Sequence, residues 1–163
     1  MDLSVVVPAF NEAESLPELA EWVDRVCVSS SIDYELIIID DGSSDNTWDV
    51  LRRLSEGNRK IKALRFRRNY GKAAALQTGF EASAGEVVIT MDADLQDSPD
   101  EIPEMVSMIR REGYHIVSGW KKKRYDPFIK RITSKFYNFT ARTFSGIRLH
   151  DLTAGSRHMM AEL

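Results

Sequence analysis

EVVITMDADLQDSPD, residues 86–100, joins an apolar run to a group of side-chain oxygens. Residues 87–91 carry no charge and are rich in β-branched side chains, which predicts a strand buried on both faces. Asp92, Asp94 and Gln96 follow immediately. A buried strand that ends in carboxylates needs a positive partner at its tip, because an unpaired buried charge is costly. In open α/β sheets, ligands bind just beyond such carboxyl ends.

Asp92, Asp94 and Gln96 offer only oxygen ligands, at two-residue spacing. Ligands of this kind suit a hard cation such as Mg²⁺ or Mn²⁺, which proteins commonly share with substrate phosphates. An Asp-x-Asp pair by itself is more often a solvated acidic turn. Its position at the end of a buried strand favours the metal site.

The composition is that of a soluble globular protein. A chain of 163 residues predicts a single domain, 1–163, with a real core. Hydrophobic content of 43%, charged content of 29% and a net charge of −3 give no reason to expect nucleic acid as a partner. The single cysteine, Cys27, excludes an internal disulfide and fits a reducing compartment. No apolar run approaches the ~20 residues of a spanning helix. The N-terminus also lacks signal-peptide features, so we expect a cytoplasmic protein.

Apolar runs alternate with helical patterns along most of the chain. This alternation predicts an α/β fold, with a mostly parallel sheet and helices on both faces. We expect strands over 3–7, 34–39, 61–66, 87–91 and 114–119, and helices after Asn11, over 46–56, over 71–84 and from Ser98 to Gly113.

A group of mainly polar residues follows each of four successive strands. Each group alone has a structural explanation: Asn11 as a helix cap with Glu14, the aspartate pair as a turn, the arginines as a solvated face. Parallel order nevertheless brings all four groups to one edge of the sheet. They are Pro8, Phe10, Asn11 and Glu12; Asp40 and Asp41; Arg65, Arg67, Arg68, Asn69 and Lys72; and Asp92, Asp94 and Gln96.

Six segments of the chain match a family pattern. Together they resemble the family-two glycosyltransferases with the GT-A (Rossmann-like) fold, most closely the dolichol- or polyprenyl-phosphate sugar synthase branch. The resemblance covers essentially the whole chain. The segments are VVVPAFNE (5–12), IIIDDGSSDNT (37–47), NYGKAAALQTGF (69–80), MDADLQDSPDEIP (91–103), VSGWKKKRYDP (117–127) and LHDLTAGSR (149–157).

This resemblance implies a role for each matching residue. The nucleotide-sugar donor is expected to meet Pro8, Phe10, Glu12, Asp40, Asp41, Lys72 and Asp92. Asp92 and Asp94 form the metal motif, with Asp94 and Gln96 as the most direct ligands of Mg²⁺ or Mn²⁺. Lys121, Arg124 and Arg131 are expected to face donor or acceptor phosphates, and Asp92, Asp94, Arg124 and Asp151 to take part in catalysis.

The resemblance also implies the reaction. An inverting transfer would move one sugar from a UDP- or GDP-sugar to polyprenyl or dolichyl phosphate, with the cation neutralising the leaving diphosphate. An alcohol acceptor would need a carboxylate base, whereas a lipid phosphate is already an anion and needs only positioning. Asp151 is therefore expected to be a base or an acceptor-orienting group, and the alternative is a cap or turn residue. The branch continues beyond this pattern, so we expect a truncated chain. Two alternatives are a transferase acting on a saccharide acceptor in cell-envelope glycan synthesis and an inactive nucleotide-sugar-binding fragment. A sugar-nucleotide pyrophosphorylase is disfavoured, because residues 7–10 contain no glycine.

The segment 120–144 combines a basic run with an amphipathic pattern. Lys121 to Arg124 are four consecutive cations, and aromatic and aliphatic residues then recur at three- and four-residue spacing. This pattern is typical of an interfacial helix, here at the cytoplasmic face of a membrane that holds the anionic acceptor. The alternative is an ordinary helix that packs the same apolar side on its own sheet.

Overall fold

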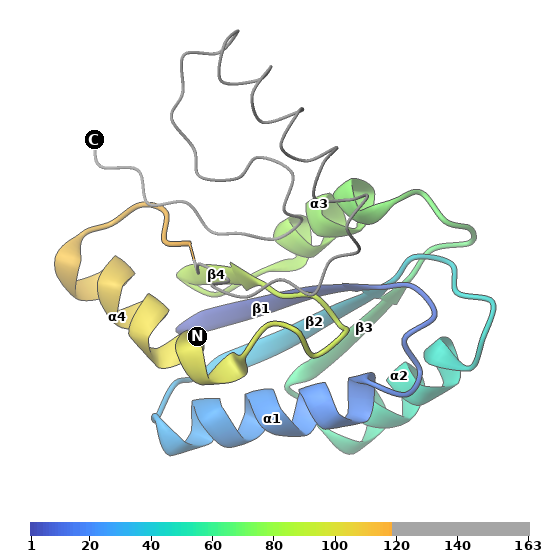
Figure 1. Ribbon diagram of the computed structural model, residues 1–163, viewed down its shortest axis with the longest axis horizontal. Coiled ribbons are helices and arrows are strands. Elements are labelled where there is room, and N and C mark those ends of the chain that lie inside the picture. The colour runs from blue at the N-terminus through green and yellow to red at the C-terminus, as the bar shows by residue number, and fades with distance from the viewer. Residues whose placement is uncertain (119–163) are drawn as a thin grey trace, which may run out of the picture. The chain divides into compact units, whose positions relative to one another are not determined.

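The computed structural model describes residues 1–118, and residues 119–163 lie outside the described part. Residues 1–115 form one compact unit around a parallel sheet (Figure 1). The single domain expected over 1–163 therefore stays a prediction. In chain order the elements are β1 (Leu3–Ala9), α1 (Leu16–Ser29), β2 (Tyr34–Asp40), α2 (Thr47–Gly57), β3 (Ile61–Arg65), α3 (Lys72–Ala82), β4 (Val87–Thr90), the 3₁₀ turn η1 (Pro99–Glu101) and α4 (Ile102–Glu112).

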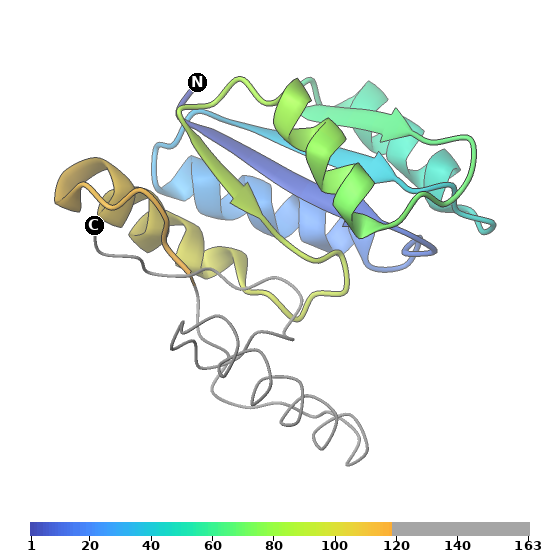
Figure 2. The ribbon, with the colours of Figure 1, turned by 90° about the horizontal axis from the view of Figure 1, so that it is seen from above.

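The four strands are parallel and lie in the order β3-β2-β1-β4. The connections from β1 to β2 and from β2 to β3 run in one direction along the sheet. The connection from β3 to β4 runs back past β2 and β1 to the other edge. Because such crossovers are right-handed, α1 and α2 must cover one face and α3 the other. Figure 1 shows α3 above the sheet and α1 and α2 below it, and Figure 2 shows α3 lying over the strands. The predicted α/β fold, a parallel sheet with helices on both faces, is confirmed.

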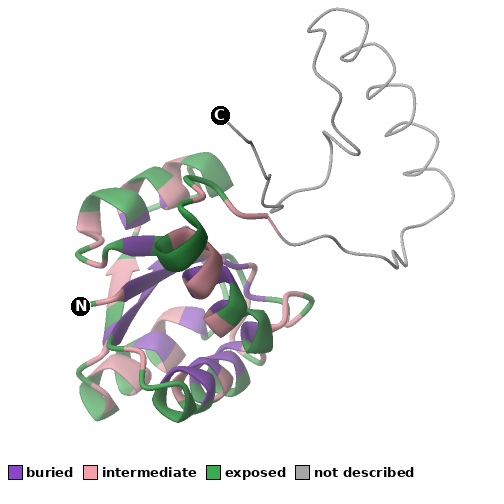
Figure 3. Cartoon of the chain, turned by 90° about the vertical axis from the view of Figure 1, so that its left-hand side faces the viewer, coloured by how far each residue is buried: buried purple, intermediate pink, exposed green. Residues whose placement is uncertain are grey.

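The central strand β2 is buried along its whole length. Helices cover both of its faces, which explains why residues 36–39 form an unbroken apolar run. Figure 3 shows the buried residues gathered in the strands and on the inward sides of the helices. On the face of the sheet opposite α1 and α2, α3 approaches β1 so closely that a Cβ at Gly79 would lie 2.2 Å from Val6 Cγ1.

The strand β4 buries only one of its faces within the described residues. Val87 and Ile89 are buried, but Val88 is 39% exposed. The helix α3 packs mainly over β1 and β2, so it leaves the same face of β4 uncovered. The predicted burial of this strand on both faces is therefore wrong for the described part of the chain.

Two other sequence expectations need correction. Residues 114–118 form no strand in the described part, and Ile116 is 54% exposed. An apolar run becomes a strand only where a neighbouring edge accepts its backbone hydrogen bonds, and none of the described strands does so. Pro8 does not end β1, which continues to Ala9. The carbonyl of Val6 points toward β4, and Pro8, two residues later, has its nitrogen on the same side. The pairing with β4 already ends at Val6. Pro8 therefore removes no hydrogen bond from the sheet.

The helices of the described part are all short. Among residues 1–118, none combines the length and the apolar character that crossing a bilayer requires.

Candidate functional site

The site is organised by the point at which the strand order reverses. The sheet runs outward from β1 to β3 and then resumes at β4 on the other side of β1. Ligands of open α/β sheets bind outside the carboxyl ends of the strands at such a switch point. The loops that follow β1, β2, β3 and β4 all lie at this end of the sheet, on the right of Figure 1.

The loop after β1 is tied to the loop after β2. Asn11 adopts a left-handed backbone, with φ of 59°. Its N–H donates to Ser43 Oγ (2.9 Å), and its Oδ1 accepts the N–H of Ser44 (2.9 Å). The N–H of Glu12 donates to Thr47 Oγ1 (2.9 Å). Asn11 is therefore not the helix cap that its spacing predicts, because its side-chain oxygen is used across the site and α1 begins farther along the chain.

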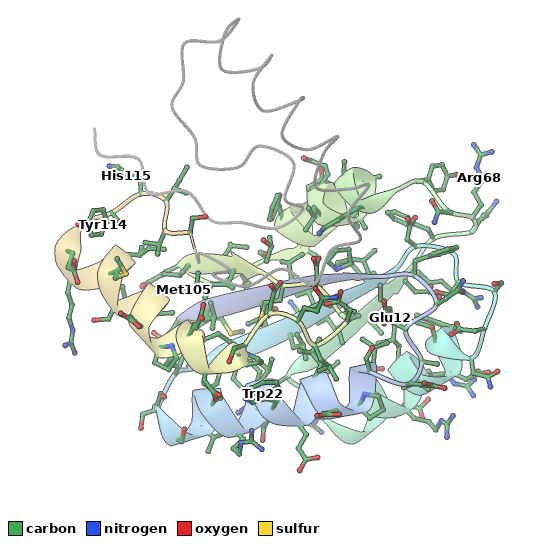
Figure 4. All side chains as sticks on the ribbon, viewed as in Figure 1. Glu12, Trp22, Arg68, Met105, Tyr114 and His115 are labelled. Carbon is green, nitrogen blue, oxygen red and sulfur yellow. The ribbon has the colours of Figure 1, made fainter. Side chains whose placement is uncertain are left out.

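A hollow of about 510 Å³ opens between these loops and the end of β4, and residues 11–15, Asp45, Asn46 and Asp94 line it. Figure 4 shows Glu12 at this end of the sheet. Four of the lining side chains are carboxylic acids and none is a cation, so the hollow favours cations and hydrogen-bond donors. Burial would raise the pKa of Asp45, but hydrogen bonds from the hydroxyl and N–H of Thr47 outweigh it and hold that pKa below its ordinary value.

The aspartate pair at the end of β2 is buried, and both members contact other protein groups. Asp40 Oδ1 accepts the N–H of Ser43 (2.8 Å), and its Oδ2 lies 3.2 Å from Arg65 Nε. Asp41 uses both oxygens on backbone groups, accepting from Tyr70 (2.7 Å) and from Gly71 (2.9 Å). The first aspartate thus orders its own turn, and the second anchors the loop that leads into α3.

The next residue, Gly42, brings the loops after β2 and β3 into direct contact. Its φ is 71°, and a Cβ there would lie 2.3 Å from the carbonyl carbon of Arg68. Only glycine allows both this backbone conformation and this approach. Arg68 stacks over the ring of Tyr70 at 4.9 Å, and Figure 4 shows it extending away from the sheet.

The two aspartates after β4 contact different parts of the site. Asp92 forms an ion pair with Lys72, the first residue of α3, and its N–H donates to Asp97 Oδ2 (3.0 Å). Asp94 lines the hollow, and its Oδ1 accepts the N–H of Gln96 (3.1 Å). Residues 1–118 contain no group of three or more His, Cys, Asp or Glu side chains placed to hold a metal ion.

The described part of the chain brings most of the predicted site residues to one edge of the sheet. Pro8 is half-buried in β1, and Phe10 is 46% exposed just beyond it. Sequence reasoning missed Asp45 and Asn46, although both stand in the polar run after β2. Lys121, Arg124, Arg131 and Asp151 lie outside the described residues, as does the segment 120–144. The roles given to all of these residues stay predictions.

The sequence matches a known family over nearly its whole length. The family described as "Glycosyl transferase family 2" matches residues 4–162. An undecaprenyl-phosphate 4-deoxy-4-formamido-L-arabinose transferase from Pseudomonas syringae pv. syringae (strain B728a) is 38% identical over 150 residues, which are 91% of this chain and 44% of that protein. The chain thus spans less than half the length of this relative.

Two solved structures share the arrangement of the sheet and helices. Mannosyltransferase PcManGT from Pyrobaculum calidifontis, in complex with GDP-Man and Mn²⁺, superposes with a TM-score of 0.64 at 27% identity, over 74% of this chain and 35% of its own. Glucosyl-3-phosphoglycerate synthase from Mycobacterium tuberculosis, in complex with Mn²⁺, UDP and glucosyl-3-phosphoglycerate, gives a TM-score of 0.73 at 20% identity. The superposition covers 98% of this chain and 56% of that protein. The second likeness bears on the fold alone.

Proposed function

The chain belongs to glycosyl transferase family 2, and from that membership we propose that it forms the donor-binding part of an inverting, metal-dependent glycosyltransferase that transfers a single sugar. Its donor is a UDP- or GDP-sugar, and its acceptor is polyprenyl phosphate. The similarity to the undecaprenyl-phosphate transferase of Pseudomonas supports this acceptor. GDP-Man in the mannosyltransferase complex supports a nucleotide-sugar donor.

The observation that carries this proposal is the meeting of acidic groups and one lysine at the switch point. Glu12 comes from the loop after β1, Asp40 from the end of β2 and Asp41 from the loop after it. Asp92 comes from the loop after β4, where Lys72 of α3 pairs with it. A nucleotide sugar offers hydroxyl and N–H donors to carboxylates, and its diphosphate needs cations. In the proposed complex, Asp40 or Asp41 holds the base or ribose, while Lys72 lies near the base or the sugar.

The residues after β4 suit Mg²⁺ or Mn²⁺. Mg²⁺ is usually held by one or two carboxylates together with substrate phosphates, and does not need an all-protein cage. Asp94 is exposed at the rim of the hollow and close to Gln96, so both can offer oxygens while the donor supplies the rest. When bound, such an ion neutralises charge on the leaving diphosphate. Mn²⁺ in the mannosyltransferase complex supports this part of the proposal.

The acceptor side rests on the sequence beyond residue 118. Lys121, Arg124 and Arg131 are proposed to bind the lipid phosphate, and Asp151 to orient it. Because that acceptor is a membrane lipid, we place the protein at the cytoplasmic face of a membrane in peripheral contact with it. The basic run at 121–124 is the sequence feature that supports this placement.

The decisive experiment measures sugar transfer. Labelled UDP- and GDP-sugars are offered with undecaprenyl phosphate, with a saccharide acceptor, or with neither, in Mn²⁺, Mg²⁺ or EDTA. We expect a single labelled lipid product that needs the divalent ion. Product on the saccharide alone would move the acceptor to glycan synthesis. Donor binding without any transfer would make the chain a nucleotide-sugar-binding fragment.

A further inference from the structure

Lys72 forms an ion pair with an aspartate of the predicted metal motif. It pairs with Asp92 across the gap between the start of α3 and the end of β4. The pair is open to solvent, with the side chains 41% and 26% exposed respectively. Exposed ion pairs contribute little to stability, so this contact can exchange for another at low cost.

The position of Lys72 is unfavourable for the helix that carries it. It is the first residue of α3, and no acidic side chain accompanies it in the first turn. Helix N-termini carry partial positive charge, so a cation there is disfavoured. The backbone just before it is also fixed, because Asp41 holds the N–H groups of Tyr70 and Gly71. A lysine anchored at this place therefore serves its partner across the gap, and the helix gains nothing from it.

We propose that Lys72 is the displaceable counter-ion of Asp92. It neutralises this carboxylate while no donor is bound. It releases the carboxylate when a divalent cation arrives with the nucleotide, and its ammonium group then pairs with the donor diphosphate. Each charge keeps an opposite partner in both states. This inference rests on the proposed function, because it assumes a diphosphate donor and a cation near Asp92.

Two consequences of opposite sign follow from this role. Without nucleotide, Lys72 competes with the cation for Asp92, so its removal should strengthen the binding of Mn²⁺ alone. With nucleotide, Lys72 pairs with the diphosphate, so its removal should weaken the binding of UDP or GDP. A lysine that only stabilised the fold would produce neither change.

The first arm of the test titrates Mn²⁺ alone into the whole chain and follows free Mn²⁺ by electron paramagnetic resonance. We expect Lys72→Met to bind Mn²⁺ roughly fivefold more tightly than the parent, from the loss of one nearby positive charge in a watery site. Lys72→Gln, a second neutral variant, should show the same gain. Arg52→Gln is the matched control, since Arg52 is an exposed helical cation paired with Asp49 and Glu56. It should bind Mn²⁺ like the parent.

The second arm measures UDP and GDP affinity at saturating Mn²⁺. Both neutral variants at position 72 should bind more weakly than the parent, while Lys72→Arg should retain the parent's affinities for metal and nucleotide. Unchanged or weaker Mn²⁺ binding in both neutral variants would overturn the counter-ion role, even if the parent transfers sugar. Tighter Mn²⁺ binding in a chain that transfers no sugar would support the role while removing the proposed reaction.

Discussion

Asp92 and Asp94 belong to one sequence motif but have different surroundings. Asp92 is paired with Lys72 and held through its N–H by Asp97. Asp94 is exposed, and its Oδ1 accepts a hydrogen bond from the N–H of Gln96. The next residue, Leu95, adopts a left-handed backbone with φ of 60°, so the chain turns directly after Asp94. Substitutions at these two aspartates should therefore have different effects.

Replacement of Asp94 by asparagine should abolish Mn²⁺-dependent donor binding and leave the fold intact. The change removes a charge that a cation needs, but asparagine can keep the turn hydrogen bond because it retains one acceptor oxygen. Isothermal titration with UDP and GDP, with and without EDTA, measures the effect. Asp49→Asn, an exposed change on α2, is the control. A variant that binds the donor as tightly as the parent, and loses as much affinity as the parent in EDTA, would remove Asp94 from the metal site.

Alanine at Asp40 and at Asp41 should weaken nucleotide binding by roughly tenfold or more in at least one case. Each carboxylate also holds protein groups, so each variant should lose stability, on the order of 1–3 kcal/mol for the partners left unsatisfied. Asp41→Ala frees two backbone N–H groups, and its loss should be the larger. Thermal denaturation and UDP or GDP titration separate the two effects. Parental affinity in both folded variants would show that the base binds elsewhere.

Glu35 lies at the opposite end of the strands, where it should make stability depend on pH. It is 1% exposed and accepts from Ser4 Oγ and the N–H of Ala84, both at 2.7 Å, beside Lys62 Nζ at 2.5 Å. Burial would raise its pKa, but these partners outweigh burial and lower it. A lowered folded-state pKa gives stability that is present above the unfolded pKa of about 4.3 and is lost as the pH falls through the folded value.

Glu35→Gln should therefore reduce the free energy of unfolding near pH 7 and flatten its decline below about pH 4.3. Urea denaturation at a series of pH values measures both changes. Glu56→Gln is the matched control, because Glu56 lies on the surface of α2 and its carboxylate is as far as 4.0 Å from Arg52 Nε. An acid slope in Glu35→Gln equal to that of the parent would show that the buried carboxylate does not set it.

At the scale of elements, the sequence predicted the alternation well and the edges poorly. The run 36–39 is apolar throughout and lies under helices on both faces, as such a run predicts. The run 87–91 has the same character, yet Val88 is exposed because α3 crosses the sheet at β1 and β2. Local apolarity predicted both of these strands, but the crossing position of a distant helix decides how many faces of a strand are buried.

The close approach of α3 to the sheet depends on Gly79. Gly79→Ala would put a methyl group 2.2 Å from Val6 Cγ1 and 3.0 Å from Ile39 Cδ1. Because the core cannot absorb it without movement, we expect a loss of about 1–3 kcal/mol in urea denaturation. Gly57→Ala in α2 is the control, since a Cβ there meets nothing within 4 Å. That change should be neutral or stabilise by up to about 1 kcal/mol. Equal stability in the two variants would contradict the close packing.

For the whole molecule, the sequence predicted which residues come to one edge of the sheet better than it predicted their contacts. Asp40, Asp41 and Asp92 stand at strand ends, and parallel order is enough to bring them to one edge. Their partners could not be predicted, because the clamp on Gly71 and the ion pair with Lys72 join segments about 20 to 30 residues apart. Asn11 shows the same limit: its local spacing suits a helix cap, but Ser44 of another loop binds its side chain.

The last prediction concerns the chain and the membrane. Lys121 to Arg124 form a basic run, and Phe128, Ile129, Ile132, Phe136 and Phe139 recur behind it at helical spacing. Each cation near an anionic leaflet contributes about 1 kcal/mol, so four supply roughly 4 kcal/mol, which alone corresponds to about millimolar affinity. Apolar insertion or the lipid phosphate must therefore add to it.

Sedimentation with anionic vesicles should show binding that falls steeply as salt is raised. Phe136→Ser should weaken this binding without lowering donor affinity. Phe80→Ser is the matched control, because Phe80 is an aromatic side chain 47% exposed on α3, outside the basic segment. Vesicles doped with undecaprenyl phosphate then separate the two sources of attraction, since only a specific acceptor site gains from the lipid at constant surface charge. If no vesicles bind at low salt, the apolar side of 120–144 packs within the protein, and the acceptor proposal loses its support from this segment.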